Sequence, residues 1–195
     1  MTIVSSDKRS ALYWLLKQYR PENDADLRQR DAILAFVEST PDCFERSYSA
    51  GHVTGSAWVV DKTGRKVLLT HHKKLNKWLQ LGGHADGDPD TRAVALKEAE
   101  EESGLADLKP VGDGIFDLDV HPIPERKDEP AHFHYDIRFV FQANGSEQFT
   151  ISDESNKLAW IDVEQMSSLS NEESMLRMAR KWLTFSKEER PPYRR

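Results

Sequence analysis

A segment in the middle of the chain, residues 88–103, carries the strongest helix signal in the sequence. Asp88 is a good N-cap, Pro89 has the φ angle of a first helical position, and Gly104 is a natural C-terminal stop. Short strand patterns lie before and after this segment. A chain that places a strong helix between short strands, with further helices at its ends, favours an α/β (α+β) sandwich.

The strand patterns are short and bounded by turn residues. Residues 51–61 and 66–72 are joined by Lys62-Thr63-Gly64-Arg65, a connection that is typical of a β-hairpin. Further strands are expected at residues 78–83, 114–120, 131–143 and 156–162. The sequence therefore predicts a sheet with strands from both sides of the central helix.

Helical patterns occupy both ends of the chain. They are expected at residues 7–19, at residues 24–37 and at residues 172–185, and prolines follow the first two. The first two helices precede every strand pattern. We therefore expect residues 1–45 to form an N-terminal helical appendage and residues 46–195 to form the main domain.

Composition restricts the class of protein. The net charge is -6 and 31% of residues are charged, which argues against a nucleic-acid scaffold, because phosphate contacts need a basic face. Cys43 is the only cysteine, so no intramolecular disulfide is expected, which fits a reducing compartment. No segment approaches the roughly 20 apolar residues of a membrane span, and the start of the chain lacks a signal-peptide pattern. We expect a cytoplasmic protein.

Three carboxylates crowd one arc of the central helix. At about 100° per residue, Glu101 and Glu102 lie about 60° to one side and about 40° to the other of Glu98, whereas Glu100 points away. Like charges at these spacings cost about 0.2–0.5 kcal/mol per pair, and near a helix C-terminus they also oppose the macrodipole. A hard divalent cation with oxygen ligands would compensate for this repulsion. A solvated acidic face is the alternative.

The residues that precede the helix favour a bound cation over a solvated acidic face. Residues 82–105, GGHADGDPDTRAVALKEAEEESGL, resemble the Nudix box. The family pattern is Gly, five residues, Glu, seven residues, Arg-Glu, an apolar residue, any residue, Glu-Glu, any residue, Gly and an apolar residue. Its positions are filled at the correct spacing by Gly83, Lys97, Glu98, Ala99, Glu101, Glu102, Gly104 and Leu105. Two positions depart from it, because Pro89 replaces the isolated Glu and Lys97 replaces Arg.

The resemblance, which the strand order extends to about residues 50–165, implies a fold and an activity. The fold is the Nudix fold, a mixed β-sheet sandwiched between helices, with residues 46–195 as the Nudix hydrolase domain. The activity is metal-dependent cleavage of a diphosphate linkage in a nucleoside diphosphate derivative, by a Nudix-type pyrophosphohydrolase. The substrate would be a small nucleotide-type molecule, with no nucleic acid or membrane partner, and a homodimer is allowed.

The resemblance also implies site residues. Mg²⁺ or Mn²⁺ ions would be held by Glu98, Glu101, Glu102 and a backbone carbonyl of Gly82 or Gly83. They would stabilise charge on the diphosphate and lower the pKa of an attacking water. The general base would be a box glutamate or a carboxylate of a later loop, Asp153 or Glu154. Lys97 would steer a neighbouring box glutamate, and an ordinary surface lysine is the alternative.

The strand at residues 131–143 alternates between aromatic and polar side chains. Phe133, Tyr135, Ile137, Phe139 and Phe141 are expected in the core. On the other face, His132, His134, Asp136 and Arg138 are expected to line the substrate cleft or to face water. The alternative is that the His-x-His-x-Asp pattern binds a transition metal. The candidate substrate contacts are His72, Trp78, His84, His134 and Arg138. For Trp78, a position in the core is the alternative.

Two other functions fit parts of the sequence. A catalytically degenerate Nudix-like nucleotide-binding or regulatory domain would explain Pro89 and Lys97, but the three retained helix carboxylates argue against it. An isoprenoid diphosphate isomerase shares the architecture, but it would need a catalytic cysteine in the cleft, and Cys43 lies in the appendage. The leaving group of the substrate stays open.

Overall fold

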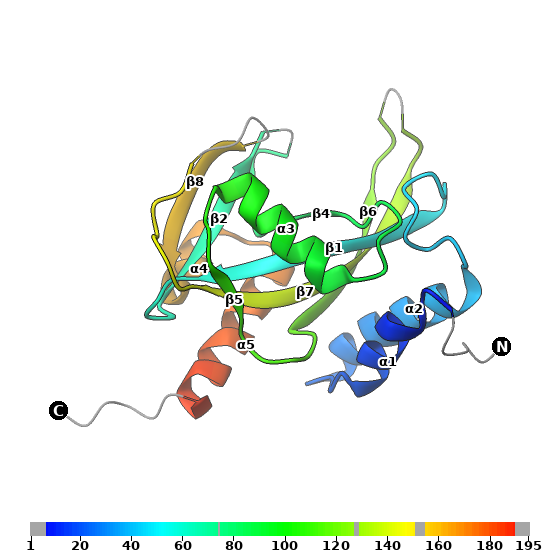
Figure 1. Ribbon diagram of the computed structural model, residues 1–195, viewed down its shortest axis with the longest axis horizontal. Helices are drawn as coiled ribbons and strands as arrows, with labels where there is room; N and C mark the ends of the chain where they lie inside the picture. The colour runs from blue at the N-terminus through cyan, green and yellow to red at the C-terminus, as the bar shows by residue number, and fades with distance from the viewer. Residues whose placement is uncertain (1–6, 74, 127–128, 151–154, 190–195) are drawn as a thin grey trace. The chain divides into compact units, whose positions relative to one another are not determined.

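The computed structural model describes residues 7–73, 75–126, 129–150 and 155–189 (Figure 1). The chain forms two compact units that alternate along the sequence. The first unit comprises residues 1–56, 82–98 and 112–139, and the second comprises residues 57–81, 99–111 and 140–195. The expected fold class is confirmed: a mixed sheet with helices, of α+β type.

In the first unit, short strands pair with two long strands. These strands are β1 (Gly51–Val60) and β7 (His132–Ala143). The short strand β4 (Leu81–His84) pairs with β1, and β6 (Asp117–Ile123) pairs antiparallel with β7. The β6–β7 register sets His121 opposite His134. Polar residues of two strands are thereby brought together in this unit.

Two N-terminal helices belong to the first unit and lie side by side in Figure 1: α1 (Ser10–Gln18) and α2 (Asp24–Ser39). Phe36 of α2 stacks on Tyr135 of β7 with ring centroids 3.7 Å apart. Gln29 Oε1 accepts a hydrogen bond of 2.8 Å from the Val120 backbone N–H of β6. Helix α2 therefore packs directly on β6 and β7. The division into an appendage of residues 1–45 and a domain of residues 46–195 stays a prediction.

The central helix, α3 (Thr91–Ser103), begins later than the sequence predicts. Asp90 caps it, because its side chain accepts a hydrogen bond of 3.0 Å from the Ala93 backbone N–H. Asp88 instead accepts 2.9 Å from the Asp90 N–H, which closes a turn ahead of the helix. The expectation that Asp88 caps the helix and that Pro89 is its first residue was therefore wrong. Asp88 and Pro89, which resemble a helix start, belong instead to the turn before α3.

The C-terminal end of α3 agrees with the prediction. Gly104 follows the last helical residue with φ +67°, and its N–H donates a hydrogen bond of 2.8 Å to the Glu100 carbonyl oxygen. This left-handed conformation is one that glycine adopts without strain. The carboxylate-bearing end of the helix is therefore defined by a backbone feature that the sequence shows directly.

The second unit is built around β2 (Lys66–His72), which follows β1 through the predicted hairpin. β2 pairs antiparallel with both β3 (Lys77–Leu79) and β8 (Ser155–Asp162). The single strand expected at residues 78–83 is wrong, since β3 pairs with β2 whereas β4 pairs with β1. The sequence pattern could not separate two short strands that have different neighbours.

The remaining elements of the second unit follow the ends of longer strands. They are β5 (Leu108–Pro110), the 3₁₀ helix η1 (Val163–Gln165), α4 (Met166–Leu169) and α5 (Glu173–Glu189). Only α5 was expected. Trp182 of α5 is buried, and its Nε1–H donates a hydrogen bond of 2.7 Å to the Gly64 carbonyl oxygen in the hairpin turn. This contact fixes the last helix against the β1–β2 connection.

Burial corrects the expected faces of β7. Ile137, Phe139 and Phe141 are in the core as predicted, but Tyr135 is only half-buried and Phe133 is 46% exposed. The polar face is buried as well: Asp136 and Arg138 are each 2% exposed and His132 is 6% exposed, so these side chains do not face water. A strand that alternates between apolar and polar side chains is expected to have one face in water. Here the polar face is also covered, because its charged side chains are paired, and the sequence pattern does not reveal this. Within the described residues, no helix has the length and hydropathy needed to cross a bilayer.

Candidate functional site

Two consecutive glycines of β4 make close contacts that a side chain would prevent. A Cβ on Gly82, whose φ is +154°, would lie 2.4 Å from Ser56 Oγ and 2.7 Å from the Gly55 carbonyl oxygen. A Cβ on Gly83 would lie 2.4 Å from both Cδ and Oε2 of Glu98. The Glu98 carboxylate therefore lies directly against the Gly83 backbone. Of the predicted metal ligands, these two residues are brought together within the first unit.

Close packing of α3 on β1 positions Glu98. A Cβ on Gly55 of β1 would lie 2.6 Å from the Thr91 carbonyl oxygen and 3.1 Å from the Ala95 backbone nitrogen. The first turns of α3 therefore rest on the backbone of β1. Thr91 and Ala95 are buried. Glu98 follows one turn later on the helix, where it reaches Gly83.

The burial of α3 separates an apolar arc from a carboxylate arc. Ala95 and Ala99 are fully buried. Glu98 and Glu102 are half-buried, and Glu101 is exposed. Their helical spacing places these three carboxylates on one arc, as the sequence predicts. Oxygen donors at a partly exposed edge, beside a backbone that excludes a Cβ, fit a hard divalent cation such as Mg²⁺ or Mn²⁺.

The residues around the box have different surroundings. Lys97 is exposed, which is compatible with either role considered for it. Arg92 lies over the Phe139 ring at 5.3 Å and donates a hydrogen bond to the Asp113 carbonyl oxygen. The candidate bases Asp153 and Glu154 lie outside the described residues.

His84 and His134, two predicted substrate contacts, meet in the first unit. Their ring centroids are 5.1 Å apart, and His52 lies 5.0 Å from His84 and 4.9 Å from His134. Burial, followed by the charge of Arg46, lowers the pKa of His84. Burial and the neighbouring histidines lower the pKa of His134 to about 2 and that of His52 to about 4. These rings are therefore neutral at neutral pH.

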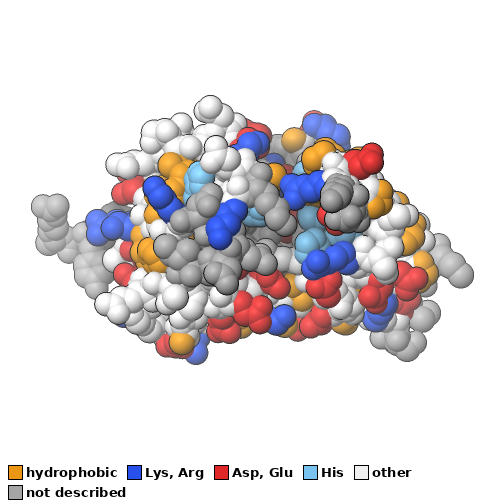
Figure 2. All heavy atoms as spheres, turned by 90° about the horizontal axis from the view of Figure 1, so that it is seen from above, with side chains coloured by type: hydrophobic (Ala, Val, Ile, Leu, Met, Phe, Trp, Pro, Cys, Tyr) orange, Lys and Arg blue, Asp and Glu red, His pale blue; other side chains and the backbone are white. Residues whose placement is uncertain are grey.

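The histidine group is larger than the sequence indicated. His132 lies 5.0 Å from His52, and His121 lies 5.5 Å from His134, between ring centroids. Histidine side chains also reach the surface on the face shown in Figure 2. His52 was missed because it stands alone in the strand pattern GHVTG, far along the chain from its partners on β7. Only the placement of β1 beside β7 reveals the group.

Arg138, a predicted substrate contact, is enclosed by carboxylates. Its Nε is 2.7 Å from Asp136 Oδ2, its Nη1 is 3.0 Å from Asp117 Oδ2, and its Nη2 is 3.3 Å from Asp119 Oδ2. Burial opposes the charge, but these carboxylates raise the pKa of Arg138 above its usual range. Thr54 and Ser56 each donate a hydrogen bond of 2.8 Å to Asp136 Oδ1. The structure thus gives Arg138 an internal role, and substrate binding by it stays a prediction.

The other predicted substrate contacts, His72 and Trp78, are half-buried residues of the second unit. His72 Nδ1 accepts a hydrogen bond of 3.2 Å from the Leu75 backbone N–H. Trp78 meets the edge of the His71 ring at 5.1 Å between centroids. The β2–β3 pairing positions both side chains. Trp78 is therefore neither fully buried nor fully exposed.

Comparison with known proteins gives one family. The family model described as NUDIX domain matches residues 51–182. Among curated proteins, no relative matched this chain. Several solved structures are similar in fold.

One similar structure is a C. elegans Ap4A hydrolase in a binary complex, at 18% identity and a TM-score of 0.57, covering 70% of this chain and 98% of that chain. Another is a Nudix hydrolase from M. smegmatis, RenU, at 16% identity and a TM-score of 0.53, covering 74% of this chain and 91% of that chain. A third is the E. coli dihydroneopterin triphosphate pyrophosphohydrolase, at 13% identity and a TM-score of 0.52, covering 68% of this chain and 95% of that chain. At these identities the likeness is one of fold.

Proposed function

The chain belongs to the Nudix family and is a Nudix hydrolase, and we propose that it cleaves a diphosphate linkage in a nucleoside diphosphate derivative with the help of divalent metal ions. The contact between the Glu98 carboxylate and the Gly83 backbone carries this proposal. It joins the first glycine of the box to the first helix carboxylate of the box. The other two carboxylates follow on the same arc of α3.

Glu98, Glu101 and Glu102 are the proposed ligands of Mg²⁺ or Mn²⁺, with a backbone carbonyl of Gly82 or Gly83. Such ions, when bound, supply charge neutralisation at the diphosphate and acidify water. The protein's part is to hold the carboxylates in place. Glu98 lies against the Gly83 backbone, and α3 lies close against β1 at Gly55. A Glu98 side chain that already lies there loses less conformational entropy when an ion binds.

The proton acceptor is proposed among carboxylates that lie near the metal ligands or in the later loop. Glu101 and Glu102 can each take a proton from water if they are not fully engaged as ligands. Glu154 is the candidate of the later loop. Lys97, beside Glu98 in the sequence and exposed, would orient a box carboxylate through its charge.

The substrate is proposed to be a small molecule with linked phosphates. An Ap4A hydrolase and a dihydroneopterin triphosphate pyrophosphohydrolase are among the similar folds, and their names support this class. The net charge of -6 disfavours a nucleic acid. His84 directly follows the glycine pair and is half-buried, so we assign it to substrate contact, with His72, Trp78 and His134 as further candidates.

The test is hydrolysis of a panel of nucleoside diphosphate derivatives with Mg²⁺ and Mn²⁺, with the products identified by mass spectrometry. Glu101→Gln and Glu102→Gln should each lower turnover by about a hundredfold or more, because a ligand charge is lost without a change of shape. Glu100→Gln is the matched control, since Glu100 is an exposed carboxylate of the same helix outside the arc, and its turnover should match wild type.

Two outcomes would contradict the proposal. Full activity in a Glu101→Gln/Glu102→Gln double variant would show that the carboxylates do not take part in catalysis. Tight nucleotide binding by wild type without turnover of any diphosphate would instead favour a degenerate binding domain.

A further inference from the structure

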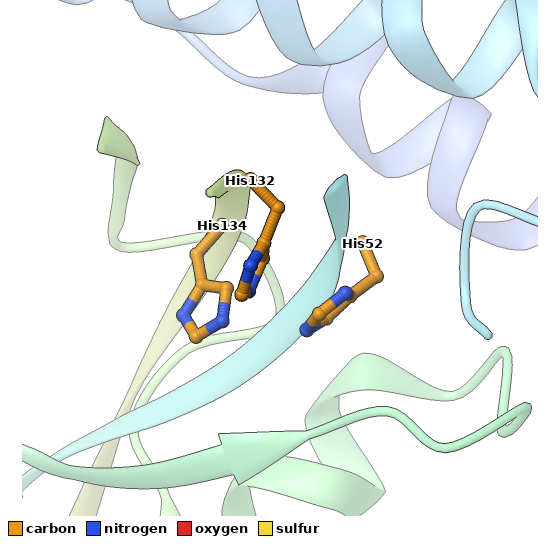
Figure 3. A group of neighbouring side chains, drawn as sticks. All are labelled: His52, His132 and His134. Atoms are coloured by element: carbon orange, nitrogen blue, oxygen red, sulfur yellow. The ribbon is translucent and has the colours of Figure 1, made fainter. Parts of the chain in front are cut away.

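Three histidines of the first unit direct their rings toward one another (Figure 3). They are His52 on β1 and His132 and His134 on β7. One ring nitrogen from each lies within 4.8 Å of the corresponding nitrogens of the other two. His132 and His134 are two positions apart on a strand, so their side chains leave the same face. The adjacent strand β1 supplies the third ring from the side.

Ring nitrogens in this group have no hydrogen-bond partner in the described part of the chain. Both nitrogens of His52 are in this state, as are Nε2 of His132 and Nε2 of His134. His52 is 1% exposed and His132 is 6% exposed. A buried polar atom without a hydrogen-bond partner destabilises the folded state, so such atoms point to a ligand. Because one ring nitrogen from each of the three histidines lies within 4.8 Å of the others, a metal ion, which accepts several lone pairs at once, is the ligand that fits them.

We propose that His52, His132 and His134 bind a transition-metal ion of the zinc class, at a site separate from the carboxylates of α3. Imidazole nitrogens suit Zn²⁺, Cu²⁺ and Ni²⁺, whereas Mg²⁺ prefers carboxylate and water oxygens. With Zn–N bonds of about 2.0–2.1 Å, tetrahedral ligands lie about 3.4 Å apart. Shifts of about 1 Å in the side chains would therefore complete the set. Three protein ligands leave a fourth position for water or another ligand.

The surroundings of His132 fix which nitrogen can bind the ion. Its Nδ1 is 2.8 Å from the Pro130 carbonyl oxygen, which accepts a proton only from an Nδ1–H. The lone pair is then on Nε2, the nitrogen without a hydrogen-bond partner. Ligand histidines commonly have such a backbone acceptor for their other nitrogen. Glu129 Oε1 lies 3.7 Å from the same Nε2 and adds a negative charge beside the site.

Other charged groups face the site from neighbouring segments. Arg46 is close enough to lower the pKa of His52 and His84, and its charge opposes a bound cation. It is paired with Asp86 at 3.0 Å, which offsets that repulsion. Asp119 Oδ2 lies 3.0 Å from Nδ1 of His121, whose ring neighbours His134. Carboxylates of neighbouring segments thus add negative charge near the histidines.

The site adjoins the proposed hydrolase site without depending on it. The His84 ring lies 5.0 Å from His52 and 5.1 Å from His134, and His84 follows Gly82 and Gly83 in the sequence. Metal binding by the three histidines requires neither hydrolysis nor the α3 carboxylates. The two proposals can therefore fail independently.

The test is equilibrium dialysis of the full chain, stripped of metal with a chelator, against Zn²⁺ in a large excess of Mg²⁺. Wild type should retain about one equivalent of Zn²⁺. His52→Gln and His134→Gln should each weaken Zn²⁺ binding by about tenfold or more, because removing a ligand costs at least as much as removing a group that orients one. His71→Gln, a change of the same kind on β2, should bind like wild type.

Two further measurements keep the outcome clear. Co²⁺ added to the stripped wild type should give the visible absorption of a four-coordinate ion, which requires no variant to fold. The Glu98→Gln/Glu101→Gln/Glu102→Gln variant should keep its Zn²⁺ even where it has lost turnover. Wild type without Zn²⁺ in excess Mg²⁺ would overturn the proposal, as would folded His52→Gln and His134→Gln variants that bind Zn²⁺ like wild type.

Discussion

The two glycines of β4 are neighbours in the sequence, yet they meet different obstacles. A side chain at Gly82 would strike the Gly55 carbonyl oxygen, which belongs to the backbone of β1 and cannot easily move. A side chain at Gly83 would strike the end of the Glu98 side chain, which can rotate away. The first glycine is therefore a requirement of folding, and the second is a requirement of carboxylate placement.

This difference predicts that alanine at Gly82 mainly lowers stability, whereas alanine at Gly83 mainly weakens metal-dependent activity. Gly82→Ala should lower the free energy of unfolding by about 1–3 kcal/mol, since its φ of +154° is accessible essentially to glycine alone. Gly83→Ala should cost less stability but displace Glu98, so the Mg²⁺ concentration for half-maximal hydrolysis should rise. Denaturant unfolding and Mg²⁺-dependent kinetics measure the two effects. Gly83→Ala with an unchanged Mg²⁺ dependence would contradict the placement of Glu98.

Among the elements, α3 shows how a turn can move the start of a helix away from the position that the sequence predicts. Asp88-Pro89 has the composition of a helix start, but the N–H at helix position three is bound by Asp90. Asp90→Ala should therefore lower the free energy of unfolding by about 0.5–2 kcal/mol. Asp88→Ala should cost less, because it removes only the turn bond to the Asp90 N–H. Thermal or urea unfolding of both variants measures these changes. A larger loss of unfolding free energy for Asp88→Ala than for Asp90→Ala would contradict the observed start of α3.

The β6–β7 pair is held by charges as well as by its backbone ladder. Arg138→Leu would leave the buried carboxylates of Asp117 and Asp136 without their cation. Breaking a buried pair in this way costs about 3–5 kcal/mol. Arg180→Leu is the matched control, since Arg180 is 61% exposed in its pair with Glu173 and such pairs contribute about 0–1 kcal/mol. Equal denaturation midpoints for the two variants would contradict a structural role for Arg138.

For the whole molecule, what the sequence predicted depends on the range of the interactions. β2 has the predicted bounds and α3 ends at the predicted glycine, because periodicity and a positive φ are local properties. The separation of β3 from β4 and the short strand β5 depend on pairing with distant strands. Local pattern does not encode those pairings.

In the candidate site, too, the features that depend on local sequence were predictable and those that depend on distant segments were not. The carboxylate arc was predictable because all its members lie within about one turn of one helix. The meeting of His52 with His132 and the enclosure of Arg138 required strands far apart in the sequence to be placed together. Alternation along β7 predicted a polar face but not that this face is buried.

The central claim is that the α3 carboxylates form a metal site and not a solvated acidic face. A ligand that binds only the folded chain adds RT ln(1 + [L]/Kd), about 2.7 kcal/mol at a hundredfold excess over Kd. The most direct measurement is thermal unfolding in increasing Mg²⁺, for wild type and for Glu98→Gln/Glu101→Gln/Glu102→Gln. Wild type should gain Tm steadily, and the variant should not respond, although without metal it is at least as stable because carboxylate repulsion is relieved. An equal rise in Tm for both proteins would contradict the claim.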